Sequence, residues 1–308
     1  MGKILTIQSC VIGLSKVGLI HCSSLKKIKK TSLAYVYDKN NNLSNKIARK
    51  FKCKTSIDFN KILKKKNIKL FVISSPTKTH EYYIRKLIKH KKMIYCEKPI
   101  LDNNKKLDQI IKLIKKNKIK FCVGLNRRFS KEYMIIKKKI KRKRPSMIHI
   151  ISRSDNHNLD LSLRNGGLFF DKGFHFFDLA CWLGSSTPKK MIVISKSISS
   201  DYFLKKGDFS DAIINLKLKN GTIVELVFSR MSRMGTIEKI NIYGKNFSLN
   251  SDNYVDKKNL HTDFSIRHKN SYFECLKRFV DFEKTFLLNE GILTQKICSK
   301  ALKLASAH

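Results

Sequence analysis

Three titratable side chains in the second half of the sequence have a spacing that suits proton transfer. Asp171, His175 and Asp178 stand at positions i, i+4 and i+7, which lie on one face of an α-helix, so two carboxylates could flank one imidazole. Such an imidazole can take a hydroxyl proton near neutral pH, and a neighbouring carboxylate orients the ring and favours its protonated form. A metal site and an ordinary buried histidine are the alternatives, but the spacing fixes no further metal ligand. We expect His175 to be a general base and Asp171 to orient it.

A lysine in the first half is the second candidate for chemistry. Lys98 follows the apolar run from Met93 to Cys96, in the sequence Glu97-Lys98-Pro99. Open α/β sheets bind their ligands at the carboxyl ends of parallel strands, and this lysine falls at such an end. The proline restricts the lysine to extended or turn conformations and so limits the direction of its side chain. A surface Glu–Lys pair is the alternative in so basic a chain.

A turn near the N-terminus has the features of a dinucleotide-binding fingerprint. Gly13-Leu14-Ser15-Lys16-Val17-Gly18 follows an apolar run and opens a helical stretch, as in Rossmann folds. Ser15 replaces the second glycine of the fingerprint, where the backbone approaches the pyrophosphate. Asp38 follows the second apolar run, about 20 residues after Gly18, and a carboxylate there binds ribose hydroxyls and repels a 2′-phosphate. The turn therefore favours NAD over NADP.

These residues require a scaffold of parallel strands, and residues 1–123 have the matching pattern. Short apolar runs alternate with helical stretches, as in right-handed crossovers. The polar turn Ser75-Pro76-Thr77, with His80 just beyond it, follows one of these runs and is expected at the same sheet edge as Lys98. We expect strands at residues 4–12, 33–37, 70–74, 93–96 and 120–123, with a helix from the glycine turn to about Lys29. The pattern predicts an α/β domain, a Rossmann fold with a doubly wound parallel sheet.

The remainder of the chain, residues 124–308, has longer strand-like segments joined by short turns. Asn220-Gly221 between two of them is a strong hairpin signal, and consecutive strands joined in this way pair antiparallel. We expect strands at residues 147–153, 191–199, 211–218, 222–229 and 236–243, and helices at 269–287 and 293–307. The pattern predicts an α+β domain with a mostly antiparallel open sheet. A second subunit normally covers the apolar face of such a sheet, so we expect a homodimer or homotetramer.

Charge is the most extreme feature of the composition. Among 308 residues, 65 Lys and Arg oppose 23 Asp and Glu, for a net charge of +42, which invites a nucleic-acid interpretation. The excess is mostly lysine and is spread along the whole chain, whereas recognition of phosphate and guanine favours arginine. The densest cluster, residues 137–144, could be a nucleic-acid or localisation patch, but a solvated helix end is the simpler interpretation. We expect no nucleic-acid partner.

Eight cysteines are scattered through apolar segments, without a Cys-x-x-Cys pair. This distribution indicates buried free thiols in a reducing compartment rather than disulfides or a zinc site. The sequence contains no uncharged apolar run long enough to span a membrane, and its N-terminus lacks the features of a secretion signal. We expect a cytoplasmic protein with no bound metal and no membrane contact.

Taken in order along the chain, these motifs resemble those of one family. The chain is similar to the Gfo/Idh/MocA oxidoreductases, the glucose–fructose oxidoreductase and inositol 2-dehydrogenase group, over essentially all of its length. The motifs that carry the resemblance are Gly13 to Gly18, Asp38, Ser75-Pro76-Thr77 with His80, Glu97-Lys98-Pro99, Val123-Gly124-Leu125-Asn126-Arg127-Arg128-Phe129, and the segment from Gly166 to Asp178. The last two motifs are the most distinctive.

The resemblance implies an NAD(H)-dependent enzyme that moves a hydride between nicotinamide and a secondary alcohol, a CH–OH group, of a polyol or sugar. Inositol 2-dehydrogenase is the nearest type, because Ser229-Arg230 and residues 240–244 resemble a stretch of that group. The implied catalytic residues are Lys98, His175 and Asp171, and no metal is implied. The expected cofactor-binding residues are Gly13, Leu14, Ser15, Lys16, Val17, Gly18, Asp38, Ser75, Pro76, Thr77, His80, Glu97 and Lys98. The expected substrate-binding residues are Lys98, Asn126, Arg127, Asp155, Asp171 and His175.

The sequence also departs from the family pattern. Besides Ser15, Thr236 and Ile237 stand where aromatic and acidic residues are often found. The identity of the substrate is therefore open, since recognition of hydroxyls rests on a few polar side chains. A nucleotide-sugar dehydrogenase or reductase of the same family is one alternative, and a catalytically inactive NAD-binding relative is another. A nucleic-acid-associated protein is the third, suggested by the charge.

Overall fold

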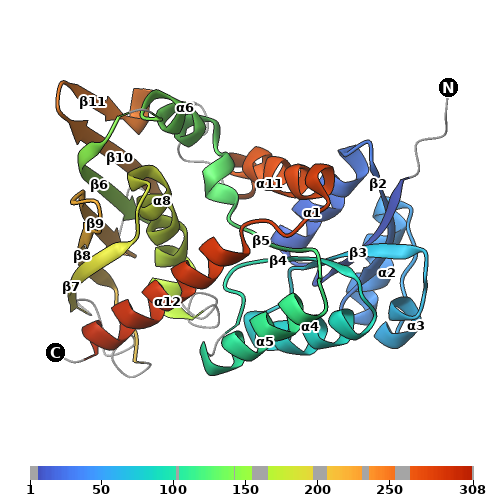
Figure 1. The fold of residues 1–308 in the computed structure, drawn as a ribbon. Helices are drawn as coiled ribbons and strands as arrows, with labels where there is room; N and C mark the ends of the chain where they lie inside the picture. Colours follow the sequence, from blue (N-terminus) through green and yellow to red (C-terminus); the bar gives the residue numbers. More distant parts are fainter. Residues whose placement is uncertain are drawn as a thin grey trace. The chain divides into compact units, whose positions relative to one another are not determined.

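Two units make up the chain in the computed structural model. The first consists of residues 1–126 and 268–292, and the second of residues 127–267 and 293–308. The described residues are 6–101, 104–141, 143–154, 166–196, 207–230, 236–253 and 264–306. The sequence predicted two continuous domains, residues 1–123 and 124–308. In the structure the first unit also includes residues 268–292 from the C-terminal part of the chain. Figure 1 shows the elements in chain order.

The strands of the first unit form one parallel sheet. In sheet order they are β2 (Thr31–Tyr37), β1 (Ile7–Ile12), β3 (Ile68–Ile73), β4 (Met93–Cys96) and β5 (Phe121–Val123). Every neighbouring pair is parallel, and most strand residues are buried because helices cover both faces. The chain order reverses beside β1, and open α/β sheets bind their ligands beyond the carboxyl ends of the strands at such a point. The doubly wound sheet predicted for this part of the chain is confirmed.

Helices flank this sheet on both faces. They are α1 (Lys16–Lys27), α2 (Asn41–Phe51), α3 (Phe59–Leu63), α4 (His80–Lys89), α5 (Asn104–Lys116) and α11 (Lys269–Phe282). α1 and α11 lie on one face, and α4 and α5 lie on the other (Figure 1). α11 belongs to this unit because it packs against α1, where the ring of Tyr272 meets that of His21 edge to face at a centroid distance of 5.6 Å.

The second unit is built on a sheet of six strands. In sheet order they are β11 (Phe247–Asn250), β10 (Ile237–Gly244), β6 (Pro145–Arg153), β9 (Ile223–Ser229), β8 (Asp211–Leu218) and β7 (Pro188–Lys196). The β6–β9 pair is parallel and the other neighbouring pairs are antiparallel, so the sheet is mixed but mostly antiparallel, as predicted. The hairpin predicted at Asn220-Gly221 joins β8 to β9, with Gly221 at φ +92° and Asn220 Oδ1 accepting a hydrogen bond from the Thr222 N–H at 3.2 Å.

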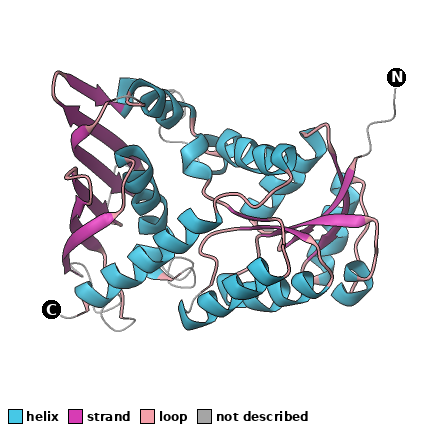
Figure 2. Cartoon of the chain, viewed as in Figure 1, coloured by secondary structure: helices cyan, strands magenta, loops and turns pink. Residues whose placement is uncertain are grey.

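One face of this sheet is covered and the other carries exposed apolar residues. The covering helix α8 (Phe174–Gly184) is almost entirely buried and packs against β6, and Figure 2 shows helices and strands of the chain in separate colours. Period-2 alternation exposes Ile192, Ile194, Ile213 and Ile223, while Val193, Ala212, Ile214 and Val224 next to them are buried. The remaining helices are α6 (Lys131–Lys139), α10 (Phe264–Arg267) and α12 (Leu288–Ala305).

The cysteines of both units are free thiols, and all but one of the eight are buried. Burial raises the pKa of Cys22 to about 12 and that of Cys53 to about 11. These two thiols therefore stay protonated at neutral pH and are poor nucleophiles. In the part of the chain that the structure describes, no helix is long and apolar enough to cross a membrane.

Candidate active site

The turn between β1 and α1 requires glycine at two positions. Gly13 has φ +87°, and a Cβ added there would overlap the backbone nitrogen of Ser75 in the turn after β3. A Cβ on Gly18 would overlap the carbonyl oxygen of Gly13. In the neighbouring turn Ser75 is half-buried, Pro76 is exposed and Thr77 is buried. The glycines thus close the first turn tightly against the second, as a dinucleotide fingerprint requires.

Ser15, at the position of the second glycine, keeps an ordinary extended backbone with φ −67° and ψ −176°. Its exposed side chain makes no capping hydrogen bond to α1, and the first turn of this 12-residue helix has no acidic residue. The N–H groups at the helix start therefore meet no competing anion from α1 itself, and they suit a pyrophosphate. Around Ser15, Leu14 is buried, Val17 is half-buried and Lys16 is exposed.

Asp38 braces the same turn from the end of β2. Its Oδ2 accepts a hydrogen bond from the Leu14 N–H at 2.8 Å, and its Oδ1 accepts one from the Asn40 N–H at 3.0 Å. The Asp38 N–H in turn donates to Ser44 Oγ at 2.8 Å. Asp38 is half-buried, so it is fixed beside the turn and still reachable by a ribose hydroxyl. The glycine turn, the start of α1 and this carboxylate fit the adenosine half of NAD.

Glu97 forms a buried pair with a histidine that the sequence did not single out. Its Oε1 lies 2.7 Å from Nε2 of His21 in α1, and the two residues are 7% and 0% exposed. The rings of Tyr95 and Tyr272 pack edge to face on His21. Glu97 was expected to contact the cofactor; the structure holds its carboxylate inside the unit, where it fixes the backbone that leads into Lys98.

Lys98 stands at the carboxyl end of β4 and is half-buried, at the sheet edge where a ligand contact is expected. His80, also expected to contact the cofactor, holds this segment from the opposite side. Its Nε2 lies 2.8 Å from the carbonyl oxygen of Ser75, and its Nδ1 lies 3.0 Å from that of Pro99. Burial lowers the pKa of His80, so the ring is neutral at pH 7 and donates its one N–H to the carbonyl oxygen of either Ser75 or Pro99. The buried ring thus packs between the turn after β3 and the segment that follows Lys98.

The helical geometry expected for Asp171 and His175 was wrong. Residues Leu168–Gly173 form a π-helix (η3), and α8 begins only at Phe174. The two side chains therefore do not sit on successive turns of one α-helix, because a π-turn bonds residue i to i+5 and shifts the faces. His175 is 8% exposed and Asp171 is half-buried. Single π-turns of this kind are frequent at functional sites.

Asp178, which was expected to flank the imidazole, accepts hydrogen bonds from Arg128 through both of its carboxylate oxygens. Nε of Arg128 donates to Oδ2 at 2.8 Å, and Nη2 donates to Oδ1 at 2.6 Å. Asp178 is 1% exposed, so this two-bond pair neutralises a buried carboxylate. The guanidinium also lies over the ring of Trp182. The only sequence signal for this ion pair was the acidic residue Asp178 within the otherwise apolar run of α8.

The three further residues expected to bind substrate differ in their surroundings. Asn126 is buried and its Nδ2 donates to Ser271 Oγ at 3.0 Å. Arg127 Nη2 lies 3.1 Å from Oε1 of Glu238 in β10. Asp155 lies outside the described residues. Asn126 and Arg127 are thus both engaged by other protein side chains.

The predicted residues form one group in each unit. In the first unit, the glycine turn, Asp38, the turn after β3 and Lys98 gather at the carboxyl edge of the parallel sheet. In the second unit, Asp171 and His175 lie on η3 and the start of α8. Among the described residues, no group of three or more histidine, cysteine or acidic side chains could hold a metal ion.

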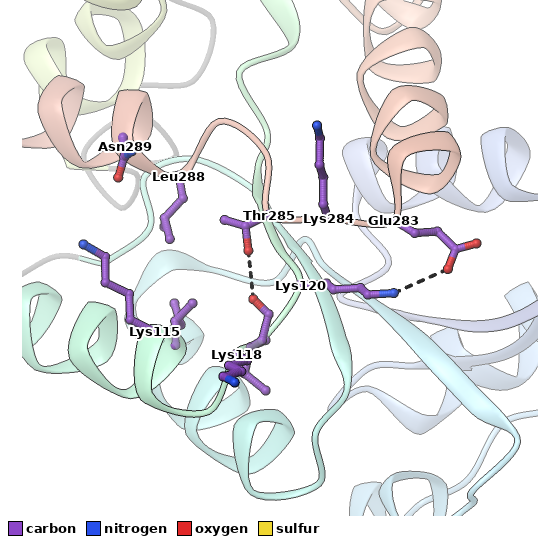
Figure 3. A pocket seen from close by; sticks show the side chains of 10 residues that line it. Lys115, Lys118, Lys120, Glu283, Lys284, Thr285, Leu288 and Asn289 are labelled. Atoms are coloured by element: carbon purple, nitrogen blue, oxygen red, sulfur yellow. Dashed lines mark hydrogen bonds and ion pairs between the residues drawn. The ribbon is translucent and has the colours of Figure 1, made fainter.

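Two surface cavities of the first unit contain none of the predicted site residues. The larger, of about 510 Å³, lies beside the start of β5, and Figure 3 shows its lining. Lys120 pairs there with Glu283 at 3.5 Å, and Thr285 donates to the Ile119 carbonyl at 3.0 Å. The other, of about 440 Å³, lies between the C-terminal ends of α4 and α5. Both lie at the amino edge of the sheet, opposite the edge that binds ligands in this architecture.

In a comparison with known proteins, both parts of the chain match models of the same protein family. Residues 7–125 match the model of an oxidoreductase family with an NAD-binding Rossmann fold, and residues 139–250 match the GFO/IDH/MocA C-terminal domain. An uncharacterized oxidoreductase of Bacillus subtilis is 26% identical over 89% of this chain and 86% of its own. The myo-inositol 2-dehydrogenase of Thermotoga maritima is 26% identical over 88% and 86%.

The fold has solved counterparts as well. The crystal structure of a probable dehydrogenase from Thermotoga maritima matches with a TM-score of 0.91 at 24% identity, over 98% of this chain and 97% of that one. The family resemblance predicted from the motifs is confirmed. The chain is a member of the GFO/IDH/MocA family of NAD-binding oxidoreductases.

Proposed function

We propose that this protein transfers a hydride between NAD and a secondary alcohol of a polyol or sugar, with an inositol as the first substrate to test. The observation that carries the proposal is the carboxyl edge of the parallel sheet, where the NAD-fitting turn and Lys98 occur together. The similarity to a protein named myo-inositol 2-dehydrogenase supports the choice of substrate class.

The residues that would hold NAD lie on three neighbouring segments. The start of α1 would bind the pyrophosphate through its N–H groups, and Asp38 would accept hydrogen bonds from the adenosine ribose. Gly13 allows the turn to approach Ser75, so the segment after β3 can line the same edge. Bound NAD supplies the hydride acceptor.

The protein supplies position and proton transfer. Lys98 would donate a hydrogen bond to the reacting oxygen, and His175 would take the hydroxyl proton while a hydride leaves the same carbon. Asp171 would orient the imidazole or accept a hydrogen bond from an adjacent substrate hydroxyl. Glu97 acts as a positioning residue, since its pair with His21 fixes the backbone before Lys98.

Titration with NADH followed by a substrate panel tests this proposal. We expect NADH to bind, and we expect NAD to be reduced in the presence of one or more inositols or sugars. The panel includes nucleotide sugars, because a nucleotide-sugar dehydrogenase is the alternative within the family. NADH binding without turnover of any alcohol would reject the enzyme in favour of an inactive NAD-binding protein, and the absence of NADH binding would reject both.

We further propose that the protein is a cytoplasmic homodimer or homotetramer. The exposed apolar residues of β7, β8 and β9 support self-association through the open face of the second sheet. The eight free thiols support a reducing compartment. Light scattering during gel filtration measures the mass, and a monomer at micromolar concentration would contradict the oligomer.

A further inference from the structure

A lysine in η3 makes no ion pair with any residue that the structure describes. Lys172 directly follows Asp171, and its Nζ donates hydrogen bonds to Ser154 Oγ at 2.8 Å and to Ser152 Oγ at 3.4 Å. Both partners are neutral hydroxyls on or just after β6. The ammonium group is therefore held in place by two hydroxyls, and no carboxylate of the described residues is in contact with it.

The acidic side chains around Lys172 are largely engaged by other cations. Glu238 lies 3.1 Å from Arg127 and 2.6 Å from Arg267. Arg127 and Arg230 are close enough to lower the pKa of Lys172, and Glu238 and Asp171 are close enough to raise it. Burial is the largest influence, and the pKa falls to about 8.

Arg127 leaves further donors without acceptors. Its Nη2 reaches Glu238, but its Nε and Nη1 are buried and have no hydrogen-bond partner among the described residues. A buried polar group without a partner is costly, and so is a buried charge without a counterion. A negatively charged ligand group beside Lys172 would supply the counterion that its ammonium group lacks among the described residues.

We propose that Lys172, with Ser154, forms a subsite for an oxyanion carried by the substrate. The preferred substrate would then be a sugar or polyol that bears a carboxylate or a phosphate, since such groups accept charge-assisted hydrogen bonds from ammonium and hydroxyl donors. The inference rests on the proposed function, because it places the subsite beside Asp171, one of the residues proposed to act on the substrate. A neutral polyol offers only hydroxyls and brings no negative charge to the ammonium group.

Calorimetric binding in the presence of saturating NADH tests the subsite with two matched pairs. D-glucuronate is compared with D-glucose for the carboxylate, and myo-inositol 1-phosphate with myo-inositol for the phosphate. We expect at least one anion to bind about 10-fold or more tightly than its neutral counterpart, as a hydrogen bond to a charged group provides. That preference weakens as the pH rises through about 8, because Lys172 loses its charge.

Three substitutions make the test specific. Lys172→Met should abolish the preference for the anion, and Lys172→Arg should retain it because the cation is kept. Lys138→Met, which removes one exposed charge from α6 in the same unit, should also retain it. Equal affinity within both pairs in the wild-type protein, no binding of either anion, or a preference that survives Lys172→Met would each overturn the subsite.

The outcomes also separate this inference from the function on which it rests. Reduction of NAD on neutral polyols without any preference for anions would overturn the subsite and leave the dehydrogenase. An anion preference that depends on Lys172, in a protein that oxidises no alcohol, would support the subsite and reject the dehydrogenase.

Discussion

The buried pair between His21 and Glu97 allows a quantitative test of how the catalytic edge is held. His21→Phe removes the hydrogen bond to Glu97 and keeps an aromatic ring of similar size. That ring can preserve the contacts with Tyr95 and Tyr272, whose centroids lie 5.1 and 5.6 Å from that of His21. The substitution therefore isolates the polar interaction from the packing.

The magnitude follows from the hydrogen bonding and burial of the pair. Nδ1 of His21 is buried without a partner among the described residues, and its Nε2 lies 2.7 Å from Oε1 of Glu97. A hydrogen bond to a charged group contributes about 1.5–3 kcal/mol, and removing one partner of a buried pair costs about 3–5 kcal/mol because the other charge stays buried. With Glu97 only 7% exposed, we expect His21→Phe to lower the free energy of unfolding by about 3 kcal/mol.

Urea unfolding followed by circular dichroism measures this loss. Replacing the exposed His90 by Phe is the control for a histidine-to-phenylalanine change elsewhere in the first unit. The double variant His21→Phe/Glu97→Leu removes the stranded carboxylate and should recover part of the stability, giving a coupling energy above about 1 kcal/mol. A loss below about 0.5 kcal/mol in His21→Phe, or additive effects in the double variant, would refute the buried-pair account.

Three further outcomes follow from the described contacts. Asp38→Ala should reduce the preference for NAD over NADP, and it removes the carboxylate that accepts the hydrogen bond from the Leu14 N–H; unchanged discrimination in competitive titration would show that another residue contacts the ribose. Burial lowers the pKa of His80 below its unfolded value of about 6.5. The contribution of neutral His80 to the free energy of unfolding is therefore full above that pH and is lost as the pH falls, because the unfolded chain binds the proton more tightly. A free energy of unfolding that stays constant between pH 7 and pH 5 would contradict this. Arg128→Met strands the buried carboxylate of Asp178 and should cost about 3–5 kcal/mol in urea unfolding; a change under 1 kcal/mol would show that the pair contributes little.

Local pattern was sufficient to predict most of the fold. Alternating apolar runs and helical stretches predict the parallel sheet, and β4 begins and ends where its apolar run does. Asn220-Gly221 predicts the β8–β9 hairpin because its backbone conformation is a local property. The short β11 was not predicted, since Phe247–Asn250 offers too few residues for a period-2 signal. The return of α11 to the first unit depends on tertiary contact with α1, which no periodicity encodes.

The candidate site was predictable in its residue types but not in its hydrogen bonds. Lys98 and the glycine turn lie where strand ends predict them, because position along the chain determines the sheet edge. The partner of Glu97 is 76 residues away in sequence, so only the folded structure identifies His21. The residues around Asp171 show no sequence pattern that distinguishes a π-helix from an α-helix, so the sequence did not predict η3. The burial that lowers the pKa of Lys172 arises from tertiary packing, which the sequence pattern does not show either.

A single-turnover measurement of NADH formation tests the dehydrogenase proposal most directly. On the best substrate of the panel, Lys98→Met and His175→Asn should each slow the formation of NADH by about 10²- to 10⁴-fold, the usual contribution of a positioned acid–base group. Calorimetric affinity for NADH should stay close to that of the wild-type protein, because binding of the adenosine half rests on the glycine turn and Asp38. Wild-type rates in either variant would contradict the assignment of Lys98 and His175 to the chemistry.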